Sequence, residues 1–170
     1  MGIEIERKFL VVGDAWRAQA RRPQRLRQGY LSAPQLDGAP PCSVRVRIAD
    51  DAATLNLKSA TAGIRRDEFE YAIPLADAQA LLALAHGVID KVRHHVDAGP
   101  HVFEIDEFLG DNAGLVVAEI ELRAIDEAFE RPVWLGREVS DLKRYYNLHL
   151  GAHPYSRWSE AERNADDRPC

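Results

Sequence analysis

Apolar and charged residues alternate along most of the chain, and a period of two residues is the pattern of β-strands. Near the N-terminus, Glu4, Glu6 and Lys8 share one side of an extended strand. Ile5 and Phe9 project to the opposite side. Neighbouring carboxylates on one strand face lie about 6.5 Å apart and repel each other unless a cation lies between them. This segment alone fits both a solvated edge strand and a cation-binding strand.

The same alternation recurs and predicts further strands, at residues 25–31, 43–48, 54–58, 66–73, 91–96, 102–108 and 116–123. Residues 32–41, rich in Pro, Gly and Asp, are predicted to form a loop. We expect helices at residues 14–20, 76–86 and 140–150, the first capped by Asp14 and the last by Ser140.

The second expected helix has Leu81, Leu82, Leu84 and Ala85 as its apolar side and Gly87 as its C-terminal stop. An ordered connection around Pro132, Trp134 and Gly136 precedes the third helix.

Composition narrows the class of protein. A chain of 170 residues with 46% hydrophobic and 29% charged residues fits one soluble domain with its own core. No apolar run is long enough to span a membrane, and the N-terminal strand leaves no room for a signal peptide, so we expect a cytoplasmic protein without a membrane partner. The net charge of −5 argues against nucleic acid as a partner. Cys42 and Cys170 suggest neither a disulfide framework nor a zinc site.

The polar faces of the expected strands carry as many cations as anions. The cations are Lys8, Arg45, Arg47, Lys58, Arg66, Lys91, Arg93 and Arg123, and the anions are Glu4, Glu6, Glu68, Glu70, Glu104, Asp106, Glu119 and Glu121. A sheet of about eight strands can close into a barrel that holds one small ligand. Because unpaired buried charge costs several kcal/mol per ion, such an interior must be hydrated, internally paired or filled by a charged ligand with its metals. A linear triphosphate suits the Arg and Lys set, and Mg²⁺ or Mn²⁺ suits the carboxylates.

The segment Glu4-Ile5-Glu6-Arg7-Lys8 resembles the ExExK signature of the CYTH proteins, also called triphosphate tunnel metalloenzymes. The resemblance covers about residues 2–150 and has the spacing of the short bacterial members, which resemble inorganic triphosphatases. It continues in order through Gln28-Gly29-Tyr30-Leu31, Val44-Arg45-Val46-Arg47, Leu57-Lys58, Arg66-x-Glu68-x-Glu70-Tyr71, Lys91-x-Arg93, Glu104-x-Asp106-x-Phe108 and Ala118-Glu119-Ile120-Glu121-Leu122.

The resemblance implies an α+β fold, with a closed eight-stranded antiparallel β-barrel that forms a triphosphate tunnel with a charged lumen and flanking helices. It implies a tunnel domain at residues 1–155, and we expect a polar C-terminal tail at 156–170. The implied metal-binding carboxylates are Glu4, Glu6, Asp106, Glu119 and Glu121. The implied phosphate-binding residues are Arg45, Arg47, Lys58, Lys91 and Arg93, to which Arg66 and Arg123 are added.

Lys8 and Tyr30 resemble the catalytic Lys-Tyr dyad of some hydrolytic members. A tyrosine is about three pH units too weakly acidic to serve as a base at neutral pH, so it needs a neighbouring ammonium such as Lys8. The alternative is that Tyr30 orients the substrate by a hydrogen bond.

The expected activity is Mg²⁺-dependent hydrolysis of tripolyphosphate to pyrophosphate and phosphate, with Mn²⁺ as a second candidate metal. Alternatives within the family are thiamine triphosphatase and class IV-type adenylate cyclase, both of which need recognition of an organic group. A non-catalytic polyphosphate- or nucleotide-binding module is the alternative outside enzymes. Apolar outer strand faces left uncovered by helices make a homodimer contact a further hypothesis.

Overall fold

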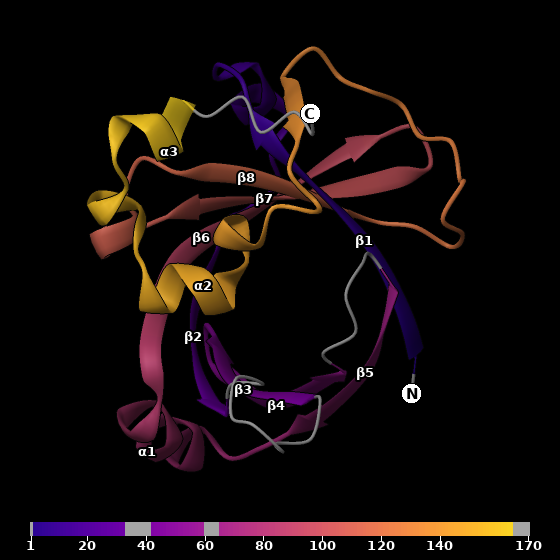
Figure 1. Cartoon of the computed structure of the whole chain (residues 1–170). Helices are drawn as coiled ribbons and strands as arrows, with labels where there is room; N and C mark the ends of the chain where they lie inside the picture. The colour runs from indigo at the N-terminus through magenta and orange to yellow at the C-terminus, as the bar shows by residue number, and fades with distance from the viewer. Residues whose placement is uncertain (1, 33–41, 60–64, 165–170) are drawn as a thin grey trace.

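The computed structural model describes residues 2–32, 42–59 and 65–164, with the backbone only of residues 2, 3, 65, 66 and 164. Its fold is α+β, with one curled nine-stranded antiparallel sheet and few helices (Figure 1). The strands are β1 (Gly2–Val11), β2 (Gln24–Ser32), β3 (Cys42–Ala49), β4 (Ala52–Ser59), β5 (Arg65–Ala72), β6 (His86–Ala98), β7 (His101–Phe108), β8 (Val116–Glu121) and β9 (Leu135–Glu138). The helices are α1 (Leu75–Leu84), α2 (Asn147–Ala152) and α3 (Glu160–Asn164), with 3-10 turns η1 (Ala15–Gln19), η2 (Gly110–Asn112), η3 (Lys143–Tyr145) and η4 (Tyr155–Arg157).

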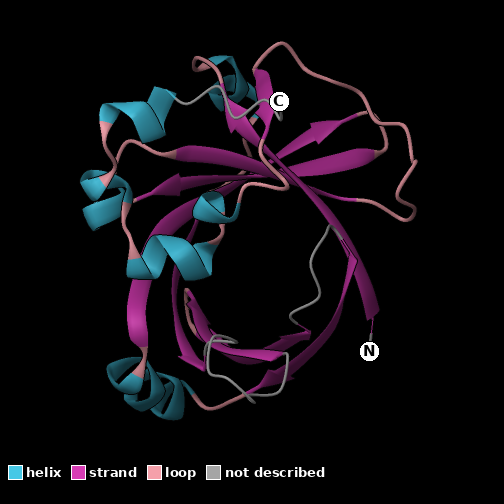
Figure 2. Cartoon of the chain, in the orientation of Figure 1, coloured by secondary structure: helices cyan, strands magenta, loops and turns pink. Residues whose placement is uncertain are grey.

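The strand order is β5-β4-β3-β2-β6-β7-β8-β1-β9, and β5 also pairs with β1. The first half of β1 pairs with β5, from Gly2 opposite Glu68 to Ile5 opposite Arg65. The second half pairs with β8, from Glu6 opposite Glu121 to Leu10 opposite Val117. The sheet therefore curls back on itself, as Figure 2 shows.

Apolar residues cover the outside of the curl. Phe9, Phe103 and Ile105 are fully buried there and pack with Trp16 of η1 and with Trp134. On the other side of the molecule, α1 lies outside the curl (Figure 1) and packs Ala78 and Leu82 against Val46 and Ala53 of β3 and β4. Since adjacent strand residues point to opposite faces, Arg45 and Arg47 project to the inside.

The inner face is charged along much of its area but apolar at one end. The apolar positions are Leu10, Ile89, Phe108 and Val117, on β1, β6, β7 and β8. Tyr145, Leu150 and Trp158 of the C-terminal segment pack on them. The C-terminal segment thus buries one end of the inner face, a contact between distant parts of the chain that strand alternation does not reveal.

The expected strands are confirmed, and the main departures concern helices. The helix expected at 140–150 is wrong, because that region forms η3 and α2 instead. Ser140 is not a helix cap, since its Oγ accepts a hydrogen bond from the Lys8 N–H at 2.9 Å. The expected helix at 14–20 is the 3-10 turn η1, and Asp14 makes no side-chain cap.

The end of the second helix also differs from the prediction. α1 ends at Leu84, and Gly87 lies inside β6 with a φ of +72°. Of the expected apolar side, Leu82 is buried but Leu84 is 71% exposed. The short strand β9 was not expected. It pairs with the end of β1, although the two strands lie far apart in the sequence. The loop expected at residues 32–41 lies outside the described residues, except for Ser32. Cys170 also lies outside them.

Among the residues that the structure describes, no helix has the length and hydropathy needed to cross a membrane.

Candidate active site on the inner face

The antiparallel register brings the predicted charged residues onto one face. Directly opposite residues of paired strands project to the same side. Lys8 is opposite Glu119, and Arg93 is opposite Asp106. The predicted site residues that the register places on the inner face are Glu4, Glu6, Lys8, Tyr30, Arg45, Arg47, Lys58, Lys91, Arg93, Asp106, Glu119 and Glu121.

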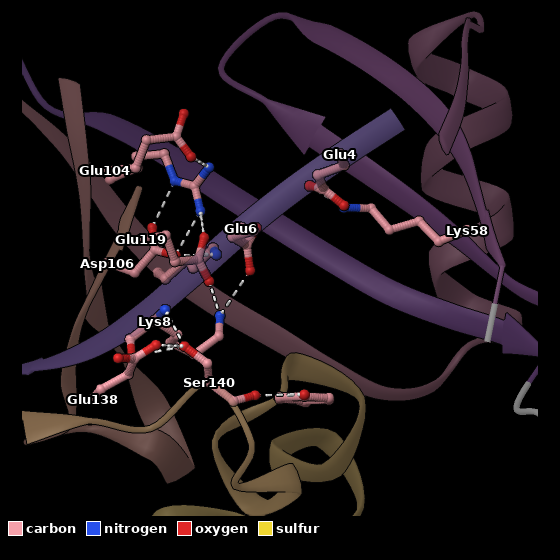
Figure 3. Close-up of polar contacts among 12 residues, drawn as sticks. Glu4, Glu6, Lys8, Lys58, Glu104, Asp106, Glu119, Glu138 and Ser140 are labelled. Atoms are coloured by element: carbon pink, nitrogen blue, oxygen red, sulfur yellow. Dashed lines mark hydrogen bonds and ion pairs between the residues drawn. The ribbon is translucent and has the colours of Figure 1, made fainter. Parts of the chain in front are cut away.

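A buried group of ion pairs lies where β6, β7, β8 and β1 meet (Figure 3). Lys8 Nζ donates to Glu119. Arg93 donates from Nε to Asp106 and from Nη2 to Glu119, each at 2.7 Å. Lys91 Nζ donates to the other oxygen of Asp106. Arg93 also donates to Glu104, and Lys8 Nζ lies 3.4 Å from Glu6, so these three cations pair with four carboxylates.

Electrostatics keep Asp106 and Glu119 ionised. Burial alone would raise the pKa of Asp106, but Arg93 and Lys91 outweigh it and lower the pKa. At Glu119 burial alone would again raise the pKa. Lys8, Lys91 and Arg93 outweigh burial and hold the pKa of this carboxyl well below its ordinary value. Burial and the repulsion of Arg93 lower the pKa of Lys91 to about 8.

A second group of polar contacts lies on β1, β4 and β5. Lys58 Nζ donates to the two oxygens of Glu4 at 2.7 and 2.8 Å and lies 3.4 Å from Glu68 (Figure 3 shows the pair with Glu4). Asn56 Nδ2 donates to Glu68 at 3.2 Å and to Glu70 at 2.5 Å. Asn56 was missed in the sequence, although its spacing of two from Lys58 was a usable signal.

The arginines of β3 have buried N–H donors, and Arg45 Nη2 lies 3.9 Å from a Glu68 oxygen, too far for a hydrogen bond. Within the described part of the chain, Arg45 Nε and Nη2 and Arg47 Nε are buried without a hydrogen-bond partner. Burial, followed by the repulsion of Arg45 and Arg93, lowers the pKa of Arg47 to about 10. Buried cations that repel one another in this way favour the binding of an anion.

Glu121, in contrast, is surrounded by negative charge. Partial burial, followed by the repulsion of Glu4, Glu104 and other carboxylates, raises the pKa of Glu121. In the described residues, no three His, Cys, Asp or Glu side chains are close enough together to form a metal centre. Because other carboxylates repel Glu121, its surroundings favour a cation. Asp106 and Glu119 differ, since Lys and Arg side chains already neutralise them.

In the described part of the chain, Tyr30 and Arg123 have no side-chain hydrogen bond or ion pair with these groups. In the strand order, β6, β7 and β8 separate Tyr30 of β2 from Lys8 of β1, whose ammonium pairs with Glu119. Arg123 is exposed beyond the end of β8, and its N–H donates to Glu127. Arg66 is opposite Glu4 in the register, but its side chain lies outside the described residues.

The fold and the inner face define a class of proteins, those with a curled antiparallel sheet that encloses ion-paired Lys, Arg, Asp and Glu side chains. The CYTH domain model matches residues 2–149, and the chain belongs to this family. The family prediction is confirmed.

Two relatives and one solved structure resemble the chain over almost its whole length. An inorganic triphosphatase from Acetivibrio thermocellus is 41% identical over 162 residues, which cover 94% of this chain and 100% of the relative. An inorganic triphosphatase from Nitrosomonas europaea is 34% identical over 151 residues, covering 86% and 95%. The crystal structure of the inorganic triphosphatase NE1496 matches with a TM-score of 0.63 and 31% identity, covering 89% of this chain and 95% of that chain.

Proposed function

We propose that this protein is a divalent-metal-dependent inorganic triphosphatase that hydrolyses tripolyphosphate to pyrophosphate and phosphate. The observation that carries the proposal is the pair of opposite imbalances on one inner face. Within the described residues, the β3 arginines Arg45 and Arg47 have buried donors that make no hydrogen bond, and Glu121 stands among other carboxylates. An anion that arrives with a divalent cation satisfies both. The relatives named above support the choice of triphosphate.

In this proposal the curled sheet works as an eight-stranded tunnel, closed by the pairing of β1 with β5. The charged residues then surround the substrate, while the apolar cluster of Ile89 and Leu150 excludes water at one end. Exclusion of water strengthens every charge interaction inside the tunnel.

The residues fit a divalent cation in part. Glu121, with Glu4 and Glu6, would hold Mg²⁺ after these side chains move closer together and Glu4 releases Lys58. Mn²⁺ is the second candidate, because these hard cations take oxygen ligands. The metal would neutralise phosphate charge and lower the pKa of a water molecule. Asp106 and Glu119 belong to the predicted metal set, but their first role in this structure is to bind Lys8, Lys91 and Arg93.

The cationic side chains position the substrate. Arg45, Arg47 and Lys91 would bind the phosphoryl oxygens, and Asp106 and Glu119 hold Lys91 and Arg93 in place. Positioning and charge neutralisation supply most of the rate in phosphoryl transfer. Tyr30, on the face of Arg45, would orient the substrate by a hydrogen bond or accept a proton, and unchanged turnover in Tyr30→Phe would remove it from the mechanism.

The test is phosphate release from tripolyphosphate, ATP and thiamine triphosphate, each with Mg²⁺ and with a chelator. Arg45→Met is the site variant, and Arg22→Met, on the exposed residue before β2, is the matched control. We expect metal-dependent release from tripolyphosphate that Arg45→Met reduces about 100-fold or more and Arg22→Met leaves unchanged.

Each other result points to a specific alternative. Faster release from thiamine triphosphate would identify a thiamine triphosphatase, and cyclic AMP formed from ATP would identify a cyclase. Tight binding of tripolyphosphate without release, with or without metal, would identify a binding module and refute the proposal.

A further inference from the structure

Gln28 is the most deeply buried polar side chain on the inner face that the charge network does not use. Its side chain is 0% exposed. Within the described part of the protein, neither Oε1 nor Nε2 has a hydrogen-bond partner. A buried amide without partners costs free energy in the folded state. Such a side chain is therefore expected to meet a partner when the protein binds its ligand.

The strand register places Gln28 between the apolar and cationic parts of the inner face. Its opposite residue in β3 is Arg47, and its opposite residue in β6 is Ile89. Ile89 belongs to the apolar cluster that the C-terminal segment buries, with Leu150 and Trp158. Tyr30 lies two residues further on the same strand face, opposite Arg45. Gln28 thus marks the point where the cationic surface ends against the apolar cluster.

The unpartnered donors around Gln28 point to the ligand. Arg45 Nε and Nη2 and Arg47 Nε are buried donors that make no hydrogen bond in the described residues, like Gln28 Nε2. Donors that converge from β2 and β3 call for an acceptor with several oxygens, and a phosphoryl group is one. Arg45 and Tyr30 keep 6% and 9% exposure, so a ligand would reach Gln28 past these two side chains.

We propose that Gln28 contacts the substrate directly, by donating from Nε2 to the terminal phosphoryl group of the triphosphate. Oε1 accepts from a hydroxyl of that group or from water that enters with it. The group is the terminal one because Gln28 is opposite Ile89, and the apolar side chains of the cluster around Ile89 do not bind a further phosphate. An amide at this position adds a donor without adding a further positive charge to Arg45 and Arg47. This inference rests on the function proposed above.

The test variant is Gln28→Met, because methionine keeps the length of the side chain and removes both polar atoms. Gln79→Met, on the exposed surface of α1, is the matched control. We expect the dissociation constant of tripolyphosphate, measured by calorimetry without metal, to rise about 10- to 100-fold in Gln28→Met. The KM for hydrolysis rises to a similar extent and kcat changes less. The melting temperature of the ligand-free protein stays equal or increases, since no unpartnered amide remains buried.

Gln28→Glu is the second variant and keeps the experiment decisive if methionine disturbs folding. It conserves size, removes the donor and adds a negative charge, so we expect weaker binding than in Gln28→Met. Unchanged affinity in either folded variant would show that Gln28 holds only water, and this would overturn the inference. Lower stability of the ligand-free Gln28→Met protein with unchanged KM would overturn it as well. Wild-type protein that neither binds nor hydrolyses tripolyphosphate would instead refute the proposed function and this inference with it.

Discussion

The Lys8 ammonium and the Glu119 carboxylate form an ion pair between directly opposite residues of β1 and β8. Each side chain is 7% exposed. Burial lowers the pKa of Lys8, but Glu119 and Glu6 outweigh burial and raise it, so the pair is charged. Lys8 was expected to act on the substrate and Glu119 to bind metal. In this structure the two side chains also connect the N-terminal strand β1 to β8.

Removal of one partner leaves the other charge buried. We expect Lys8→Met to lower the free energy of unfolding by about 3–5 kcal/mol, as is usual for a broken buried ion pair. The double variant Lys8→Met/Glu119→Gln should lose less than the sum of the two single variants, because each loss is partly the same interaction. Urea denaturation without metal measures these energies.

Lys143→Met is the control for loss of an exposed lysine and should change stability by less than about 0.5 kcal/mol. Strict additivity of Lys8→Met and Glu119→Gln would contradict an ion pair between them.

Replacement of Glu121 should have the opposite effect on stability. Because nearby carboxylates repel Glu121, Glu121→Gln should stabilise the metal-free protein, by about 0.5 kcal/mol since partial exposure screens the repulsion. When Mg²⁺ is added, the melting temperature of Glu121→Gln should rise less than that of the wild-type protein. Thermal unfolding with a chelator and over a Mg²⁺ titration measures both effects. Glu130→Gln, on an exposed loop residue, is the control, and an equal Mg²⁺ response in Glu121→Gln would remove this carboxylate from the metal site.

Much of the fold was predictable because an alternation of two residues is a local property. Arg45 and Arg47 share a face whatever their strand pairs with, and the same holds for Glu119 and Glu121. Their common face therefore followed from the sequence, and the family motif indicated the curled antiparallel sheet.

The contacts between distant segments were not predictable from alternation. Ser140 accepts a hydrogen bond from the Lys8 N–H, and the two residues are 132 positions apart. Trp158, in the segment expected to be a polar tail, is 4% exposed and packs on Tyr145. Which cation neutralises which carboxylate also depends on the order of strands, and Lys8 pairs with Glu119 because β8 lies next to β1.

Stability at acid pH should depend on Glu138. Hydrogen bonds from Arg7, one of them 2.8 Å long, hold the pKa of Glu138 below its ordinary value. On acidification the unfolded chain takes up a proton at this site before the folded protein does, so the stabilisation is present at neutral pH and is lost from about pH 5 downward. Glu138→Gln should cost about 1 kcal/mol at pH 7 and progressively less as the pH falls below about 5.

Glutamine leaves Arg7 on the rings of Phe9 and Phe129, at 5.6 and 5.2 Å, so this stacking does not change. Urea denaturation across this pH range measures the difference between wild type and Glu138→Gln. Asp51→Asn, in an exposed turn, is the control, and a difference that stays constant from pH 7 to pH 3 would contradict the prediction.

The contact between β6 and α2 should depend on Gly87. Its φ of +72° disfavours any side chain, and an added Cβ would lie 2.4 Å from the carbonyl oxygen of Gly151 in α2. Gly13 has a similar φ of +65°, but an added Cβ there would meet no atom within 4 Å. We therefore expect Gly13→Ala to cost only the backbone strain, about 1–2 kcal/mol. Gly87→Ala should cost more by at least about 1–3 kcal/mol, since α2 must also move away from the sheet. Thermal and urea unfolding of both variants separate the two contributions, and equal losses would show that the contact with Gly151 yields without cost.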